Sequence, residues 1–192
     1  MKLALVQLML RPDEASERVA LAEATARAVA RGVDAVVMPV DALGDIRDLD
    51  VLGRVVVLTG DAAIDPEELG KLSIAPPEVL VLAPGAESDI QAEAVLELAL
   101  ALSFSVAGLV LVSERSGAEP GDPGHGGSAI VLLGEVLAEA MADDDILYAE
   151  IPVPIPPPGP RAMLPAVPPI LLQRLAHHRG ERLGVEYPAD LT

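Results

Sequence analysis

The sequence contains no cysteine and very few aromatic side chains. With no cysteine among its 192 residues, the chain can form no disulfide, no zinc–thiolate site and no cysteine nucleophile. Phe, Tyr and Trp together make up 2% of the residues, so the side chains on which single-stranded nucleic acids stack are scarce. Lysine occurs only at Lys2 and Lys71. These shortages argue against a nucleic-acid-binding protein.

Basic residues are outnumbered by acidic ones. The 30 acidic and 13 basic residues give a net charge of −17, which repels phosphate backbones and anionic membrane surfaces. The longest uncharged run, from Leu98 to Ser113, is shorter than the ~20 residues that span a bilayer. The first residues lack a signal-peptide pattern. We therefore expect an acidic, cytoplasmic protein that binds neither nucleic acid nor membranes.

Aliphatic side chains are abundant, and hydrophobic residues make up 51% of the chain. Short apolar runs predict strands at 3–8, 34–38, 54–59, 78–82 and 105–112. Helix-start patterns between them, at Asp13, Asp65 and Ser88, predict an α/β protein with parallel neighbouring strands. We expect the run from Arg54 to Asp61 to be a fully buried strand at the centre of its sheet.

The first predicted helix has an apolar face. Val19, Ala22, Ala26 and Val29 recur every three or four residues, which predicts that this face packs on the core. The spacing of Glu14 with Arg18, and of Glu23 with Arg27, predicts two ion pairs on the solvent side.

The pattern changes after residue 113. A hairpin turning at Gly134 and a strand at 146–151 predict antiparallel pairing. Nine of the 18 prolines lie between Pro152 and Pro169, which predicts an extended arm before a short helix at 170–179. We divide the chain into an α/β domain, 1–151, and a packing or oligomerisation extension, 152–192.

Four polar side chains are candidates for a site at the carboxyl ends of the strands, where α/β proteins place their chemistry. They are Thr59, Asp61, Glu114 and His125. A catalytic threonine needs a neighbouring base, and no His or Lys lies near Thr59 in the sequence. Thr59 is therefore either a nucleophile or an inert residue. His125 lies among glycines, and either an acid–base role or a surface position fits it.

Other charged groups have weaker interpretations. The aspartates of the connection at 41–50 lack the spacing of a calcium loop, so a solvated loop is the alternative to a metal site, and we predict neither metal nor cofactor. Asp89, Glu93 and Glu97 form one helical stripe, either a solvent face or a docking surface for a basic partner. His177 and His178 point about 100° apart on a helix and are expected at the surface.

Six segments, taken in order, resemble the carbon–nitrogen hydrolase (nitrilase/amidase) superfamily over residues 1–151. They are Lys2-Leu-Ala-Leu-Val-Gln7, Ala30-Arg-Gly-Val-Asp-Ala-Val-Val-Met-Pro39, Val56-Val-Leu-Thr-Gly-Asp61, Asp65-Pro-Glu-Glu-Leu69, Glu78-Val-Leu-Val-Leu-Ala-Pro84, and Gly126-Gly-Ser-Ala-Ile-Val131 with Gly134-Glu-Val-Leu-Ala138. The resemblance implies an α-β-β-α sandwich, here with a reduced mixed sheet and the proline-rich arm.

The resemblance also implies a degenerate catalytic site. Family members use a Glu base, a Lys and a Cys nucleophile; Val40 stands at the Glu position and Thr59 at the Cys position. Residues 41–53 are too few for the two strands that would carry the Lys. The expectation is a truncated, inactive protein that acts as an interaction or structural subunit, with itself or with another protein. The arm is expected to cover the sheet edge that the truncation exposes.

Two alternatives remain from the sequence. One is a module that binds a small amide or amine in a remnant pocket at Thr59, Asp61, Glu114 and His125. The other is a residual C–N hydrolase that uses Thr59.

Overall fold

The computed structural model describes residues 1–182 apart from residues 10, 12, 40–46, 117, 120, 121, 124, 142 and 160–163. Val40, Asp41 and Asp45 therefore lie outside the described residues.

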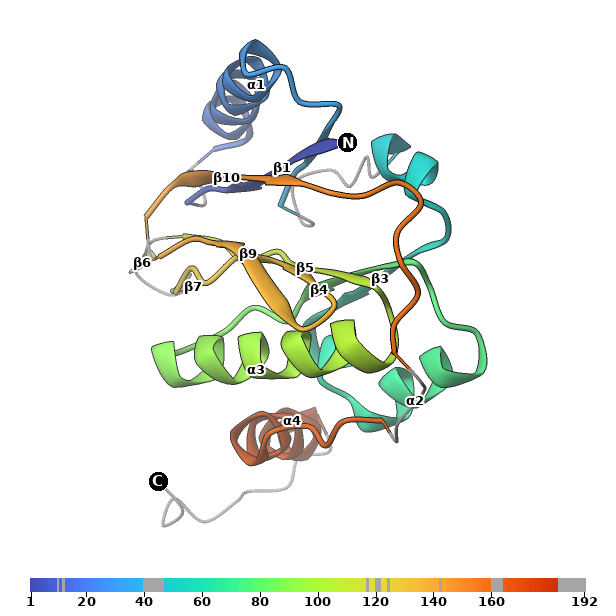
Figure 1. Ribbon diagram of the computed structural model, residues 1–192. Helices are drawn as coiled ribbons and strands as arrows, with labels where there is room; N and C mark the ends of the chain where they lie inside the picture. The colour runs from blue at the N-terminus through green and yellow to red at the C-terminus, as the bar shows by residue number, and fades with distance from the viewer. Residues whose placement is uncertain are drawn as a thin grey trace.

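Two β-sheets face each other between layers of helices (Figure 1). The smaller sheet has the strand order β10-β1-β2, with β10 at Asp145–Glu150, β1 at Lys2–Gln7 and β2 at Ala35–Val37. The larger has the order β3-β4-β5-β8-β9, at Val55–Thr59, Val79–Ala83, Leu109–Val112, Ala129–Leu132 and Glu135–Glu139. A short ladder joins β6 (Ala118–Glu119) to β7 (Asp122–Pro123).

Helices cover the outer faces of both sheets, which completes the predicted α-β-β-α sandwich. Helix α1 (Glu14–Ala30) covers the smaller sheet, and α2 (Pro66–Ile74) and α3 (Asp89–Ser105) cover the larger one (Figure 1). Helix α4 (Pro169–Arg182) lies against α3. Two 3-10 helices, η2 (Arg47–Leu52) and η3 (Gly60–Ala63), flank β3.

Strand directions follow the predicted change of pattern. Strands β1 and β2 are parallel, as are β3, β4 and β5, whereas β8 and β9 are antiparallel. The hairpin turns at Leu133 and Gly134, whose φ angles are 48° and 84°, the positive values that a tight hairpin turn requires. Strand β10 then crosses to the smaller sheet and pairs antiparallel with β1.

The helix starts predicted from capping patterns are confirmed. The Asp13 carboxylate accepts a hydrogen bond from the Ser16 amide at 2.9 Å, and Asp65 accepts one from the Glu67 amide at 3.0 Å. The Ser88 hydroxyl accepts one from Gln91 at 3.3 Å. These signals are local: each side chain satisfies an amide two or three residues ahead of it.

The prediction that the strand from Val55 is central and fully buried is wrong. Strand β3 is the edge of the larger sheet and its residues are half-buried or exposed, whereas β4 and β5 are fully buried. The smaller sheet is too narrow to face β3 with a strand. Helix η2 contacts both β2 and β3 and places the buried side chains of Leu49 and Leu52 in the core between the sheets.

The face of α1 that was predicted to be buried is exposed. Val19 and Val29 are 58% and 60% exposed, and Ala22 and Ala26 are exposed with them. The helix packs on the smaller sheet through its other side, where Ala24 and Ala28 are fully buried. Alanine-rich sequence is apolar on both sides of a helix, so periodicity did not identify the side that packs.

Of the two ion pairs predicted on α1, one forms. The Arg18 guanidinium lies 2.5 Å from the Glu14 carboxylate. Arg27, by contrast, forms no ion pair with Glu23 or with any other described acid. Its side chain lies toward β10 instead.

The C-terminal segment belongs to the core of the same chain. Val167, Leu171 and Leu175 are buried with α2, α3 and one face of the larger sheet. Helix α4 continues through Gly180, where it was predicted to stop. The arm before it crosses the amino end of β5, where a Cβ on Gly108 would lie 2.3 Å from the Pro156 carbonyl oxygen.

The edge-covering role predicted for the arm is not seen within the chain, because its described residues form no strand pairing with β3. Within the described part of the chain, no helix has both the length and the apolar character needed to cross a membrane.

Candidate functional site

The carboxyl ends of the parallel strands from both sheets meet at one rim of the sandwich. Strands β3, β4 and β5 end there together because they are paired in parallel. Gln7, the last residue of β1, accepts a hydrogen bond at 2.9 Å from the Ser128 amide, which precedes β8 and lies opposite the end of β5. This rim is the place where an α/β sheet carries a site.

Thr59 ends β3 at this rim and is exposed. It lies opposite Ala83 of β4 and precedes η3. Its hydroxyl makes no hydrogen bond to a described residue. A threonine hydroxyl without a base is almost wholly protonated and is a poor nucleophile.

Asp61 and His178 are paired at the same rim. The His178 Nδ1 atom lies 2.9 Å from an Asp61 carboxylate oxygen, and its Nε2 atom lies 3.2 Å from the Glu87 carboxylate. The prediction that His178 is a surface residue is therefore wrong, since the side chain is 28% exposed and lies between two acids.

Two arginines extend this contact along α4. Arg174 is 8% exposed, and it donates to the Pro84 carbonyl oxygen at 2.6 Å and lies 3.4 Å from the Glu87 carboxylate. Arg179 pairs with Asp65, the N-cap of α2. Helix α4 thus binds the loops that follow β3 and β4 through three side chains. Arg174 is followed by His178 four residues later and by Arg179 five residues later.

Sequence reasoning missed this docking. Arg174 and His178 contact residues 83 to 117 positions away. The only signal was their i,i+4 spacing, which places both side chains on one face of the helix.

Glu114 lies deeper at the rim and joins the two sheets. It is 5% exposed, and its carboxylate accepts a hydrogen bond at 3.2 Å from the Ala86 amide. Its own amide donates to the Ser128 hydroxyl at 2.9 Å, and Ser128 is bonded to Gln7. Gln7 donates in turn to the Met141 carbonyl oxygen at 2.5 Å. No local signal identified Gln7 beforehand, because its role depends on Ser128, which is 121 positions away.

His125 lies apart from these groups. Its Nδ1 atom is 3.5 Å from the Asp89 carboxylate at the start of α3. The four predicted site residues therefore share one rim, but the hydrogen bonds and ion pairs of Asp61, Glu114 and His125 given above lead to different partners. No hydrogen bond joins Thr59 to any of them.

Neither of the chain's two lysines forms a hydrogen bond with Thr59. Lys2 begins β1 at the opposite rim. Lys71 lies on α2, where its ammonium is 2.6 Å from the Glu68 carboxylate, and that hydrogen bond raises the pKa of Lys71. Among the described residues, no three His, Asp or Glu side chains gather in a way that would hold a metal ion.

A second polar cluster at this rim surrounds Asp144. Its carboxylate contacts the Arg11 guanidinium, the Ser116 hydroxyl and the Met9 amide, each at 2.5 Å. Partial burial alone would raise the pKa of Asp144. The hydrogen bonds from Ser116 and Met9, together with the Arg11 charge, outweigh that effect and hold the pKa below its usual value.

Comparisons with known proteins identify the fold. No protein-family model matches the sequence, and no curated protein matches it either. The structure is similar to a cysteine-to-serine variant of an amidase from Nesterenkonia AN1, of the nitrilase superfamily, with a TM-score of 0.63 and 15% identity over 94% of this chain and 97% of that one. It is also similar to an amidase from Nesterenkonia sp. with a TM-score of 0.61 and 15% identity, over 79% of this chain and 90% of that one.

The chain therefore has the nitrilase-like α-β-β-α fold that the sequence motifs predicted. A third similar structure, with a TM-score of 0.61 and 15% identity over 79% of this chain and 90% of that one, is a variant of the Nesterenkonia sp. AN1 amidase that carries the acetamide moiety of fluoroacetamide covalently on its active-site cysteine. The present chain has no cysteine, so it has no residue that could form the same thiol adduct.

Proposed function

We propose that this chain is a catalytically inactive nitrilase-like protein that acts as an interaction subunit and assembles with a second copy of itself. The observation that carries the proposal is the exposed apolar face of α1. Four side chains at i, i+3, i+7 and i+10 leave the body of the protein, although their pattern is that of a buried face. They are Val19, Ala22, Ala26 and Val29.

The spacing of this face suits a second helix. Intervals of three, four and three residues are those of the a and d positions of a coiled coil, which bring two helices into contact along one seam. An apolar stripe of this kind, exposed in a monomer, is typical of a protein–protein contact. A two-fold axis near Ala24 would place Val19 opposite Val29 of the second copy and Ala22 opposite Ala26, so the face is self-complementary.

The charge around the stripe supports a second copy as the occupant. A net charge of −17 opposes self-association in general. The stripe itself is uncharged, however, and of the charged residues beside it, Arg18 is already paired with Glu14. The stripe therefore offers two copies an uncharged contact, beside which Glu23 is the one acid of α1 that its predicted partner Arg27 does not pair.

The inactivity rests on the residues at the rim. Among the described residues, no base contacts the Thr59 hydroxyl, and Asp61 already faces His178. Lys2 begins β1 at the opposite rim and Lys71 is paired with Glu68, so neither lysine is offered to a developing oxyanion, whose stabilisation is often the largest contribution to such a reaction.

The test compares the oligomeric state of three proteins by native mass spectrometry and multi-angle light scattering. The wild type is expected to be a dimer. The double variant Val19→Glu/Val29→Glu is expected to be a monomer, because a dimer of this variant would bury two carboxylates from each copy in the contact between the helices. Ile74→Glu is the matched control: Ile74 is 86% exposed on α2, and the variant should remain a dimer. A wild type that is monomeric, or a double variant that still dimerises, contradicts the proposed surface.

Inactivity is tested separately with aliphatic amides and nitriles. No turnover is expected from the wild type. Turnover that disappears in Thr59→Ala would instead support a residual hydrolase. The purified chain could be monomeric and yet be recovered from the source cell in a stoichiometric complex with a different protein. That result would overturn self-assembly and keep the interaction role, with the other protein as the partner.

A further inference from the structure

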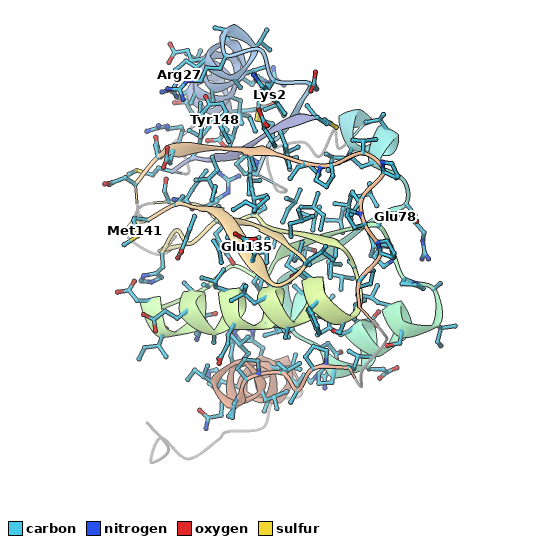
Figure 2. All side chains as sticks on the ribbon, viewed as in Figure 1. Lys2, Arg27, Glu78, Glu135, Met141 and Tyr148 are labelled. Carbon is cyan, nitrogen blue, oxygen red and sulfur yellow. The ribbon has the colours of Figure 1, made fainter. Side chains whose placement is uncertain are left out.

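A groove lies between the C-terminal half of α1 and the start of β10, on the outer side of the smaller sheet. Its volume is about 450 Å³, within the range of small-molecule sites. The lining residues are Arg27, Ala30, Arg31, Asp144, Asp145, Ile146 and Tyr148. Figure 2 shows Arg27 and Tyr148 beside each other between the helix and the strand. The groove belongs to a different sheet from Thr59.

The two arginines of the groove differ from the other arginines whose side chains the structure describes. Those other guanidiniums each contact a carboxylate or a carbonyl oxygen: Arg11 with Asp144, Arg18 with Glu14, Arg54 with the Ala75 carbonyl, Arg115 with Glu17, Arg174 with Glu87 and Arg179 with Asp65. Arg27 and Arg31 contact no described acid and form no hydrogen bond with a described residue. In a chain with 30 acidic residues, two neighbouring arginines without an acid are unusual.

Both arginines are exposed and line the groove. Arg31 lies over the Tyr148 ring, with 4.6 Å between its guanidinium carbon and the ring centroid, a cation–π contact that restricts the side chain. Arg27 is one helical turn earlier on the same side of α1. Both sit on the side of the helix that faces the sheet, away from the stripe of Val19 and Val29.

The acids on the opposite wall do not neutralise the arginines. Asp144 is already paired with Arg11 at 2.5 Å. Asp145 accepts a hydrogen bond from the Ile146 amide at 2.7 Å and forms no ion pair with Arg27 or Arg31. The groove therefore has two uncompensated positive charges against one uncompensated negative charge.

We propose that this groove binds a small organic oxyanion, a carboxylate or a phosphate ester, through Arg27 and Arg31. A guanidinium presents paired N–H donors that match the oxygens of either group. The Tyr148 ring adds an apolar wall, and Asp145 at the opposite side favours a ligand that also carries a hydrogen-bond donor or a cationic group. A simple preference of cations for the C-terminal end of a helix accounts for basic residues on α1, but not for a groove between them and an aromatic ring.

The test titrates the full-length protein with citrate and, separately, with inorganic phosphate, against sodium chloride at equal ionic strength. The variant is Arg27→Gln/Arg31→Gln. The control is Arg18→Gln, which removes a charge from the same helix outside the groove. Binding is followed by the rise in melting temperature and by the fluorescence of Tyr148 in a Tyr187→Phe background, where Tyr148 is the only tyrosine and the chain has no tryptophan.

At least one of the two anions should bind saturably, and the double variant should weaken its binding about tenfold or more, since two charge-assisted contacts are lost. Arg18→Gln should bind as the wild type does. A response to citrate alone identifies a carboxylate ligand, and a response to phosphate alone identifies a phosphate ester. The proposal is overturned if neither anion exceeds the chloride control, or if the double variant and Arg18→Gln lose binding equally.

The outcome is separable from that of the proposed assembly. Val19→Glu/Val29→Glu is expected to abolish dimers and to keep anion binding, whereas Arg27→Gln/Arg31→Gln is expected to keep dimers and to lose anion binding. A poly-glutamate peptide that binds when both small anions fail would overturn the small-molecule ligand in favour of an acidic protein segment.

Discussion

The variant Thr59→Cys places one thiol at the rim position that resembles the nucleophile of the nitrilase superfamily. The chain has no cysteine of its own, so the new thiol is the only one in the protein. Thr59 is exposed and its hydroxyl makes no hydrogen bond to a described residue, so the substitution should leave the fold and its stability nearly unchanged. The thiol therefore reports the electrostatic environment of this position.

The magnitude follows from the charges that surround Thr59. An unperturbed thiol has a pKa of about 8.5, so about 3% of it is thiolate at pH 7. Asp61 lies two residues away, Lys2 begins β1 at the opposite rim, and the Lys71 ammonium is paired with Glu68. We expect the pKa of the new thiol to be about 8.5 or higher. An activated cysteine with a pKa near 6 would be about 90% thiolate at pH 7, and would be alkylated about 30-fold faster.

The assay is the rate of alkylation by iodoacetamide from about pH 6 to 10, followed by intact-protein mass spectrometry. Ile74→Cys, at a position that is 86% exposed on α2, is the matched control. The two rates should rise with pH along similar curves, with midpoints near the ordinary thiol value. A midpoint below about 7 for Thr59→Cys alone, or amide turnover gained by this variant, would refute the reasoning that the site has lost its activating charges.

Three further perturbations test the fold and the rim. Leu171→Ala removes a fully buried side chain of α4 and should lower the free energy of unfolding by about 3 kcal/mol in urea titrations; a loss below about 1 kcal/mol would mean that α4 is not part of the core. His178→Ala should cost about 1 kcal/mol, since it removes contacts with two acids, whereas the exposed neighbour His177→Ala should cost much less. Hydrogen bonds from Ser116 and Met9, with the Arg11 charge, hold the folded-state pKa of Asp144 below its usual value, so its contribution to stability is complete above the unfolded pKa of about 4 and is lost as the pH falls through the folded pKa. Asp144→Asn should therefore lower stability at neutral pH and flatten its decline in acid; an unchanged acid profile would contradict the assignment.

The local features were accessible from the sequence because their causes are local. Asp13, Asp65 and Ser88 cap helices through amides two or three residues away. The turn at Gly134 depends on a backbone angle that glycine adopts readily. The order of the strands and the motifs along them was enough to predict the α-β-β-α class.

Which faces of β3 and α1 are buried could not be predicted from the sequence, because burial depends on what packs against each face. The run from Val55 to Leu58 is equally apolar whether it lies at the centre or at the edge of a sheet, and β3 is an edge strand because β4 is the only strand that pairs with it among the described residues. Helix α1 is apolar on two sides, and the alanines at 24 and 28 were buried because their small side chains let the helix approach the sheet closely.

The main strands and helices, three helix caps and the absence of a thiol were thus predictable from the order of residues along the chain. The tertiary structure alone decided which side chains meet. His178 was brought to Asp61 and Glu87, Arg174 to Pro84, and Arg31 to Tyr148. These contacts join residues up to 117 positions apart, and no periodicity along the chain specifies a distance across it. Both the exposed stripe of α1 and the groove beside it arise from that packing, so neither could be read before the fold was known.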